Sequence, residues 1–202
     1  MLNMQGRLAV VVGGGGVGLR KVHSLLETGA DVKLVTDELP DDAPGLKQRG
    51  VIVIHKPYCA EFLEGALLVF ACTDDRALNA QIAQDAQWVG AIANVADQPE
   101  DCDFYLPAVH GDGEVVLAVG TGGAAPALAG QLRDRLAAAL PDRIGEFAAA
   151  LGELRTVLKQ RCPQGKRRME IMKQLSDPAS YDAFLSGGEA ALREKLAALI
   201  GA

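Results

Sequence analysis

Five short apolar segments recur along the first half of the chain, and stretches of helical character separate them. The segments are Leu8–Val12, Val32–Thr36, Val51–Ile54, Ala66–Cys72 and Gly90–Val95. Nearly unbroken apolar runs such as Ala66–Cys72 are typical of strands covered on both faces, as in parallel sheets. Helices are expected over Val17–Glu27 and from the capping pair Asp74-Asp75 to about Trp88, with a Pro/Asp loop through Pro44. This alternation predicts an α/β fold with a Rossmann-type, doubly wound parallel sheet.

The pattern changes in the second half of the chain. Strands expected over Phe104–His110 and Glu114–Val119 flank the turn Gly111-Asp112-Gly113, which predicts a hairpin. From Ala125 the sequence is helical, with breaks expected at Pro141, Pro163–Gly165, Pro178 and Gly187-Gly188. We therefore expect a Rossmann domain at residues 1–112, a small α/β segment at 113–145 and a helical domain at 146–202.

A glycine-rich turn follows the first predicted strand. Gly13, Gly15 and Gly18 have the G-x-G-x-x-G spacing, and Gly16 leads into the helix expected from Val17. Such a turn lets bare backbone approach a pyrophosphate, whose oxygens then meet the amides at the positive end of the helix. The turn predicts a dinucleotide site, and a purely structural glycine turn is the alternative.

Polar residues at the ends of later strands fit the same site. Asp37 and Glu38 follow the second predicted strand, where a carboxylate accepts hydrogen bonds from ribose hydroxyls. Two carboxylates repel a 2′-phosphate, so NAD is favoured over NADP, although a solvated acidic loop has the same composition. Thr73 follows the fourth predicted strand and either contacts the adenosine half or helps to cap the following helix.

Composition narrows the classes of partner. The formal net charge is −6 and aromatic residues make up 4% of the chain, which argues against nucleic acid as a partner. Four widely spaced cysteines and three isolated histidines give no zinc-site spacing. No segment approaches the roughly 20 apolar residues that cross a bilayer. The composition predicts a cytoplasmic protein with no membrane partner.

Six motifs along nearly the whole chain resemble, in order, the precorrin-2 dehydrogenase/sirohydrochlorin ferrochelatase family, which also forms the amino-terminal half of siroheme synthases. They are the glycine turn running into Arg20-Lys21, Ala71-Cys72-Thr73-Asp74-Asp75, Asn94-Val95-Ala96-Asp97, Phe104-Tyr105-Leu106-Pro107, Gly122-Gly123-Ala124-Ala125-Pro126 and Gly165-Lys166-Arg167-Arg168.

The resemblance implies NAD-dependent oxidation of precorrin-2, a tetrapyrrole, to sirohydrochlorin. In many members insertion of ferrous iron follows and gives siroheme. It also implies a homodimer, an NAD-binding domain at residues 1–112 and a dimerisation segment at 113–145. Asp97 corresponds to the family's catalytic aspartate, which would act as a general base and could meet the iron transiently. The alternative is a turn aspartate before Pro99, without a catalytic role.

Substrate-binding residues are expected in two places. Residues 155–173 hold seven Lys or Arg residues against one Glu, and within this stretch Lys166, Arg167 and Arg168 suit a polycarboxylate substrate. A solvated helical face is the alternative. Thr121, Gly122 and Gly123 form the second place, but Gly120 and Ala125 stand where the family usually offers hydroxyls, which leaves the contacts of this loop open.

Two other functions stay open. The chain could be a dehydrogenase only, with a separate chelatase inserting the metal. It could also be a non-enzymatic NAD-binding sensor module, which would account for the glycine turn but not for Asn94–Asp97 or the basic residues.

Overall fold

The computed structural model describes residues 1–201, and its internal contacts divide the chain into two compact units. The first unit is Met1–Leu106 and the second begins at Pro107. The predicted boundary at residue 112 would cut between the two paired strands of a hairpin, which lies wholly in the second unit. The observed division therefore falls before the hairpin.

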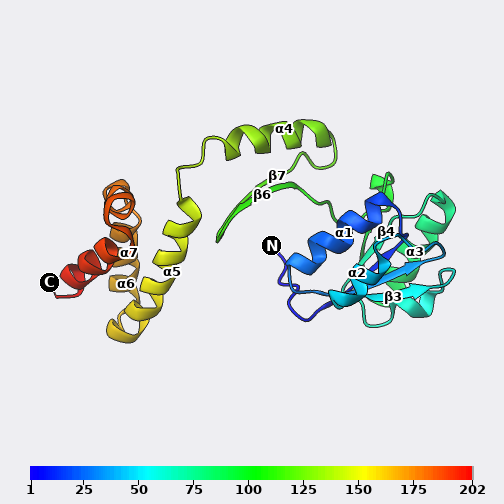
Figure 1. The fold of residues 1–202 in the computed structure, drawn as a ribbon, viewed down its shortest axis with the longest axis horizontal. Coiled ribbons are helices and arrows are strands. Elements are labelled where there is room, and N and C mark those ends of the chain that lie inside the picture. Colours follow the sequence, from blue (N-terminus) through cyan, green and yellow to red (C-terminus); the bar gives the residue numbers. More distant parts are fainter. Residues whose placement is uncertain (202) are drawn as a thin grey trace. The chain divides into compact units, whose positions relative to one another are not determined.

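The first unit contains a five-stranded parallel sheet (Figure 1). Its strands are β1 (Leu8–Val12), β2 (Asp31–Thr36), β3 (Ile52–His55), β4 (Leu68–Ala71) and β5 (Ile92–Val95), and their spatial order is β3-β2-β1-β4-β5. The predicted Rossmann-type sheet is thus confirmed. The direction of winding reverses between β1 and β4, and ligands of such sheets bind at the carboxyl ends of the strands beside this point.

Helices cover both faces of the sheet. On one face α1 (Gly16–Glu27) and α2 (Ala43–Gln48) pack against alternate strand residues such as Val11 and Phe70. On the other face α3 (Arg76–Trp88) packs against Val10 and Val69. Helix α2 corrects the expected loop: Pro44 lies in its first turn, where the missing proline N–H leaves no intrahelical hydrogen bond unmade.

The second unit begins with a two-stranded antiparallel sheet of β6 (Ala108–Asp112) and β7 (Val115–Val119). Its turn is the residue pair Gly113-Glu114, because Asp112 pairs with Val115 and Gly113 adopts a φ of +54°. The expected strand start at Phe104 is wrong. The Phe104 ring instead packs edge-on against Phe70 of the parallel sheet, with ring centroids 5.7 Å apart.

The remaining helices are α4 (Pro126–Ala137), α5 (Ile144–Arg161), α6 (Gly165–Leu175) and α7 (Pro178–Gly201). The last three enclose a separate apolar core that includes Phe147, Leu154 and Phe184. Helices end near the predicted breaks, and the Gly187-Gly188 break is a kink inside α7, where Gly188 has a φ of 64°. Within residues 1–201, no helix combines the length and apolar character needed to cross a membrane.

Candidate dinucleotide site

The glycine turn joins β1 to α1, and packing dictates two of its glycines. A Cβ on Gly13, which has a φ of 110°, would lie 2.4 Å from the carbonyl oxygen of Cys72. A Cβ on Gly18 would lie 2.0 Å from the carbonyl oxygen of Gly13. These glycines therefore let β1, β4 and α1 approach closely, which is the structural part of the G-x-G-x-x-G pattern.

Gly15 and Gly16 have no packing reason to be glycine. A Cβ on either residue would meet no heavy atom within 4 Å, so the space beside them is free. Gly15 is the N-cap of α1, and among the described residues no side chain caps this helix end or places an acid in its first turn. The first amides of a helix have no intrahelical acceptor. Together with Val17, these residues form a cradle that fits a phosphate group.

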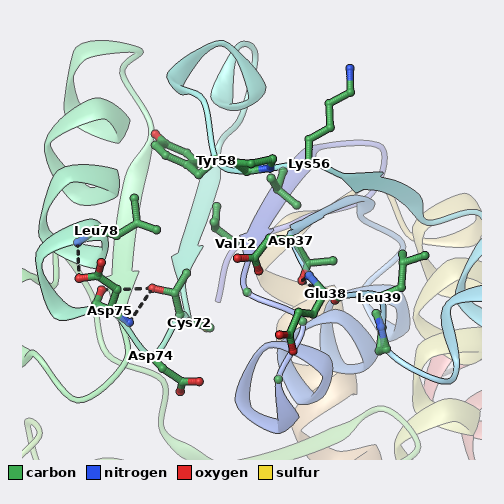
Figure 2. Close-up of a pocket in the computed structure, with 18 of the residues that line it drawn as sticks. Val12, Asp37, Glu38, Leu39, Lys56, Tyr58, Cys72, Asp74, Asp75 and Leu78 are labelled. Atoms are coloured by element: carbon green, nitrogen blue, oxygen red, sulfur yellow. Dashed lines mark hydrogen bonds between the residues drawn. The ribbon is translucent and has the colours of Figure 1, made fainter.

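A pocket of about 670 Å³ opens beside this cradle at the carboxyl edge of the sheet (Figure 2). Loops after β1, β2, β3 and β4 line it; those after β2 and β4 face each other across it. Among the predicted cofactor residues, Gly13, Gly15, Asp37, Glu38 and Thr73 line the pocket, whereas Gly16, Val17 and Gly18 lie in the adjoining first turn of α1.

The loop after β2 presents its two carboxylates to solvent at the pocket wall. Side chains hold the backbone of this loop: the Thr36 hydroxyl donates to the Glu38 carbonyl at 2.7 Å, and His55 Nε2 lies 2.9 Å from the Asp37 carbonyl. Both acidic side chains are exposed. A ribose with free hydroxyls fits this wall, and a 2′-phosphate would meet like charge.

A clamp from α3 holds the loop after β4. Asn79, which is buried, accepts from the Thr73 amide at 3.1 Å and from the Thr73 hydroxyl at 2.7 Å, and it donates to the Thr73 carbonyl at 2.9 Å. Asp75 caps α3 by accepting from the amides of Ala77 and Leu78. The capping interpretation of Asp75 is correct, and the Thr73 hydroxyl has its proton engaged within the protein.

Sequence reasoning missed the wall that follows β3. Tyr58 lines the pocket and donates its hydroxyl hydrogen to Asp85 at 2.8 Å. Burial raises the pKa of Tyr58 above its ordinary value, and the hydrogen bond to Asp85 makes a smaller contribution in the same direction. The phenol therefore stays neutral. Lys56 and Leu39 also line the pocket. Their position in the sequence could have indicated this, because loops that follow parallel strands all reach the same edge of the sheet.

Cys72, at the base of the pocket, is expected to resist alkylation. Burial raises its pKa from 9.0 to about 11, so at pH 8 its thiolate fraction is about 100-fold below that of an ordinary thiol. Iodoacetamide labelling followed by peptide mass spectrometry should modify the exposed Cys59 first. Labelling of Cys72 should accelerate about tenfold per pH unit below its pKa. Equal labelling of both cysteines at pH 8 would contradict this assignment.

Asp97 lies outside this pocket but at the same edge of the sheet. It follows β5, is exposed and adopts a φ of 58°, one of two positive values among the described non-glycine residues. Neighbouring strands lie about 4.8 Å apart, so a position two strands beyond β1 lies about 10 Å from the glycine turn. Asp97 is therefore on the opposite side of the turn from Asp37 and Glu38.

The predicted substrate residues lie in the second unit. The Thr121 hydroxyl accepts from the amide of Ala125 at 3.1 Å, while Gly122 and Gly123 make an exposed turn with positive φ. Lys166, Arg167 and Arg168 occupy the first turn of α6.

Arg168 donates to the carbonyls of Cys162 and Pro163 at 2.9 and 2.7 Å, so part of its role is to cap α5. Within residues 1–201, no group of three or more metal-ligating side chains is assembled.

The chain resembles known proteins over most of its length. It is 38% identical over 191 residues to siroheme synthase from Methylococcus capsulatus, covering 94% of this chain and 40% of that protein. It is 39% identical over 168 residues to siroheme synthase 1 from Serratia proteamaculans, covering 82% and 35%. The chain thus spans about two fifths of the length of the curated relatives it matches.

The fold also matches a solved structure. SirC, precorrin-2 dehydrogenase, superposes with a TM-score of 0.76 at 22% identity, covering 100% of this chain and 98% of that one. Residues 1–108, which contain the glycine turn and the whole pocket, match the family model described as "Putative NAD(P)-binding". The chain belongs to this NAD(P)-binding family.

Proposed function

We propose that this protein catalyses NAD⁺-dependent oxidation of precorrin-2 to sirohydrochlorin. One observation carries the proposal. The open phosphate cradle at Gly15 and Gly16 and the exposed Asp97, whose backbone is in the left-handed region, lie two strands apart at one edge of a parallel sheet. The names of the similar proteins, siroheme synthase and precorrin-2 dehydrogenase, supply the substrate class.

The pocket supports NAD⁺ in an extended orientation. The cradle at Gly15 and Gly16 would hold the pyrophosphate, with the adenosine half between the loops after β2 and β4. Asp37 and Glu38 would accept from the ribose hydroxyls and disfavour the 2′-phosphate of NADP⁺. The nicotinamide end would then extend past β4 toward Asp97. When bound, NAD⁺ supplies the hydride acceptor.

Asp97 would remove the proton that accompanies hydride loss. Oxidation of precorrin-2 by two electrons gives sirohydrochlorin, NADH and one proton, and a carboxylate beside the macrocycle is sufficient as the general base. The exposed position of Asp97 gives a large substrate access to it. The same carboxylate could accept pyrrole protons when ferrous iron, a second substrate, is inserted; we propose this as a following reaction.

Positive charge in α6 suits the carboxylates of the tetrapyrrole. Cations in the first turn of a helix oppose its dipole and cost stability. Two of the three cations in this turn have backbone partners that offset this cost. Arg168 donates to backbone carbonyls, and Arg167 makes a long 3.5 Å contact with the Ile200 carbonyl. Lys166 lacks such a contact among the described residues. We assign Lys166 and Arg167, with Thr121, Gly122 and Gly123, to substrate binding.

We further propose a homodimer formed through the hairpin and α4, in the segment at 113–145 and the adjoining β6. The outward face of the hairpin consists of the cross-strand pairs Val109–Ala118 and Gly111–Val116, all exposed. Helix α4 carries an exposed row of leucines at helical spacing: Leu128, Leu132 and Leu136. Helix α4 packs against the hairpin, and a second copy would cover the apolar surfaces that stay exposed on both.

Leu132→Glu is expected to convert the dimer to a monomer, because it places a charge in the apolar row. Analytical ultracentrifugation measures the change. Leu185→Glu, an exposed leucine on α7, is the matched control and should stay dimeric. A monomeric wild-type protein, or a dimer that survives Leu132→Glu, contradicts the proposed interface.

We propose that the protein acts in the cytoplasm, whose reducing conditions suit its four free cysteines.

The decisive assay is anaerobic. The protein is incubated with precorrin-2 and NAD⁺ while NADH and the macrocycle spectrum are recorded, and ferrous iron is added afterwards. NADH and sirohydrochlorin are expected first, then siroheme. Sirohydrochlorin without siroheme would leave a dehydrogenase only. NAD⁺ binding without turnover would overturn the proposal in favour of a sensor module.

A further inference from the structure

One sulfur atom connects the two ends of the turn that carries Asp97. The thiol of Cys102 accepts from the amide of Val95 at 3.1 Å and from Asn94 Nδ2 at 3.6 Å. Its proton faces two carbonyl acceptors, those of Val95 at 3.2 Å and Gln98 at 3.4 Å. One side chain thus connects both ends of the Val95–Gln98 turn, and Asp97 lies between them.

This arrangement replaces a missing strand. β5 is an edge strand, paired only with β4, and the last sheet contact is the amide of Ala96 donating to Ala71 at 2.9 Å. The opposite edge of β5 would leave backbone groups unpaired. Asp103 exchanges two 2.8 Å hydrogen bonds with Ala93 there, one through its carboxylate and one through its amide. Cys102 serves Val95 in the same way.

The turn needs this support because of its backbone conformation. A non-glycine residue at positive φ is less stable than in the ordinary helical or extended regions, even for aspartate, which tolerates it best. Gln98, buried beside Asp97, donates to the Asp101 carboxylate at 2.8 Å and thereby fixes the following residues. Among the described residues, only the hydrogen bonds of the Cys102 sulfur connect the start of the turn, at Val95, with its end, at Gln98.

We propose that Cys102 is a positioning residue, which holds the turn so that the Asp97 carboxylate stays aimed at the substrate. The inference rests on the proposed function of Asp97. Cys102 acts through its hydrogen bonds and does not touch cofactor or substrate. A thiol suits this position because it is both a donor and an acceptor. Two residues later the backbone is held separately, since Asn94 donates to the Phe104 carbonyl at 2.9 Å.

The test compares Cys102→Ser, Cys102→Ala and Cys102→Val. Serine keeps a donor and an acceptor, alanine removes both, and valine removes both while filling the volume in case alanine leaves the protein unfolded. Alanine and valine are expected to lower kcat about 10- to 100-fold through misplacement of the base. Serine should stay close to wild type. The Kd for NAD⁺ should not change, since Cys102 lies outside the pocket. Cys59→Ala, an exposed cysteine, is the control.

A double-mutant cycle separates positioning from general damage. In an Asp97→Asn background, single-turnover oxidation should be insensitive to Cys102→Ala, because the group that Cys102 positions is gone. An equal loss in both backgrounds overturns the inference, as does wild-type kcat in folded Cys102→Ala and Cys102→Val. Asp97→Asn alone tests the proposed function, so the two failures are distinguishable: full activity there refutes the role of Asp97, whatever the cysteine variants do.

Discussion

Asp97→Asn is expected to slow NAD⁺-dependent precorrin-2 oxidation about 10²- to 10⁴-fold, the usual contribution of a general base. Asparagine has the shape of aspartate but cannot take the proton. NAD⁺ affinity and thermal stability should stay unchanged, because Asp97 is exposed and lies outside the pocket. Stopped-flow detection of NADH under anaerobic conditions measures the loss.

The choice of asparagine follows from the backbone. Asp97 has a φ of 58°, a conformation that asparagine adopts more readily than alanine. An alanine variant would therefore mix loss of the carboxylate with rearrangement of the turn. Asp101→Asn is unsuitable as a control, since Asp101 binds Gln98. Asp31→Asn serves better, because Asp31 is exposed at the start of β2 and does not line the pocket. Activity of Asp97→Asn within twofold of wild type would show that Asp97 is a turn residue without a catalytic role.

Gly18→Ala is expected to destabilise the first unit and abolish NAD⁺ binding. Its Cβ would lie 2.0 Å from the Gly13 carbonyl oxygen, a backbone atom that cannot move without displacing the whole turn. Overpacking typically costs about 1–3 kcal/mol, and this clash belongs at the upper end. The melting temperature should fall by roughly 10 °C or more. Calorimetry with and without NAD⁺ measures both effects.

Gly15→Ala is the matched variant, with the opposite signature. A methyl group at Gly15 meets no heavy atom within 4 Å, and its φ of −71° suits alanine, so the fold should be intact. The methyl group would occupy the phosphate cradle, and NAD⁺ affinity should fall about tenfold or more, which corresponds to about 1.4 kcal/mol. Unchanged affinity in folded Gly15→Ala would contradict the cradle.

Local chemistry was enough to predict much of the first unit. The apolar runs at β1 and β4 need both faces covered, and this requirement leads to a parallel sheet between helices. Asp75 was identified as a helix cap because capping depends on neighbours in sequence. By contrast, α2 was missed since Pro44 looks like a loop residue until its place in the first helical turn is known.

The hairpin shows the same limit. The sequence contains two candidate glycines for its turn, Gly111 and Gly113, and only pairing of Asp112 with Val115 selects the second. Phe104 looks like the start of a strand, but its ring packs against Phe70, 34 residues earlier in the chain. Periodicity carries no information on such distant contacts.

The sequence by itself determined the class of fold, the glycine turn and the acidic residues beside it, because each depends on spacing within one βα unit. Tertiary structure decided which glycines are packing residues and which are open, since that depends on Cys72 and Gly13 backbone atoms brought close by folding. It also showed Asn79 clamping Thr73, Asp85 anchoring Tyr58 and Cys102 holding the Asp97 turn. These contacts satisfy polar groups of loops that follow the strands, and their partners become known only when the chain is folded.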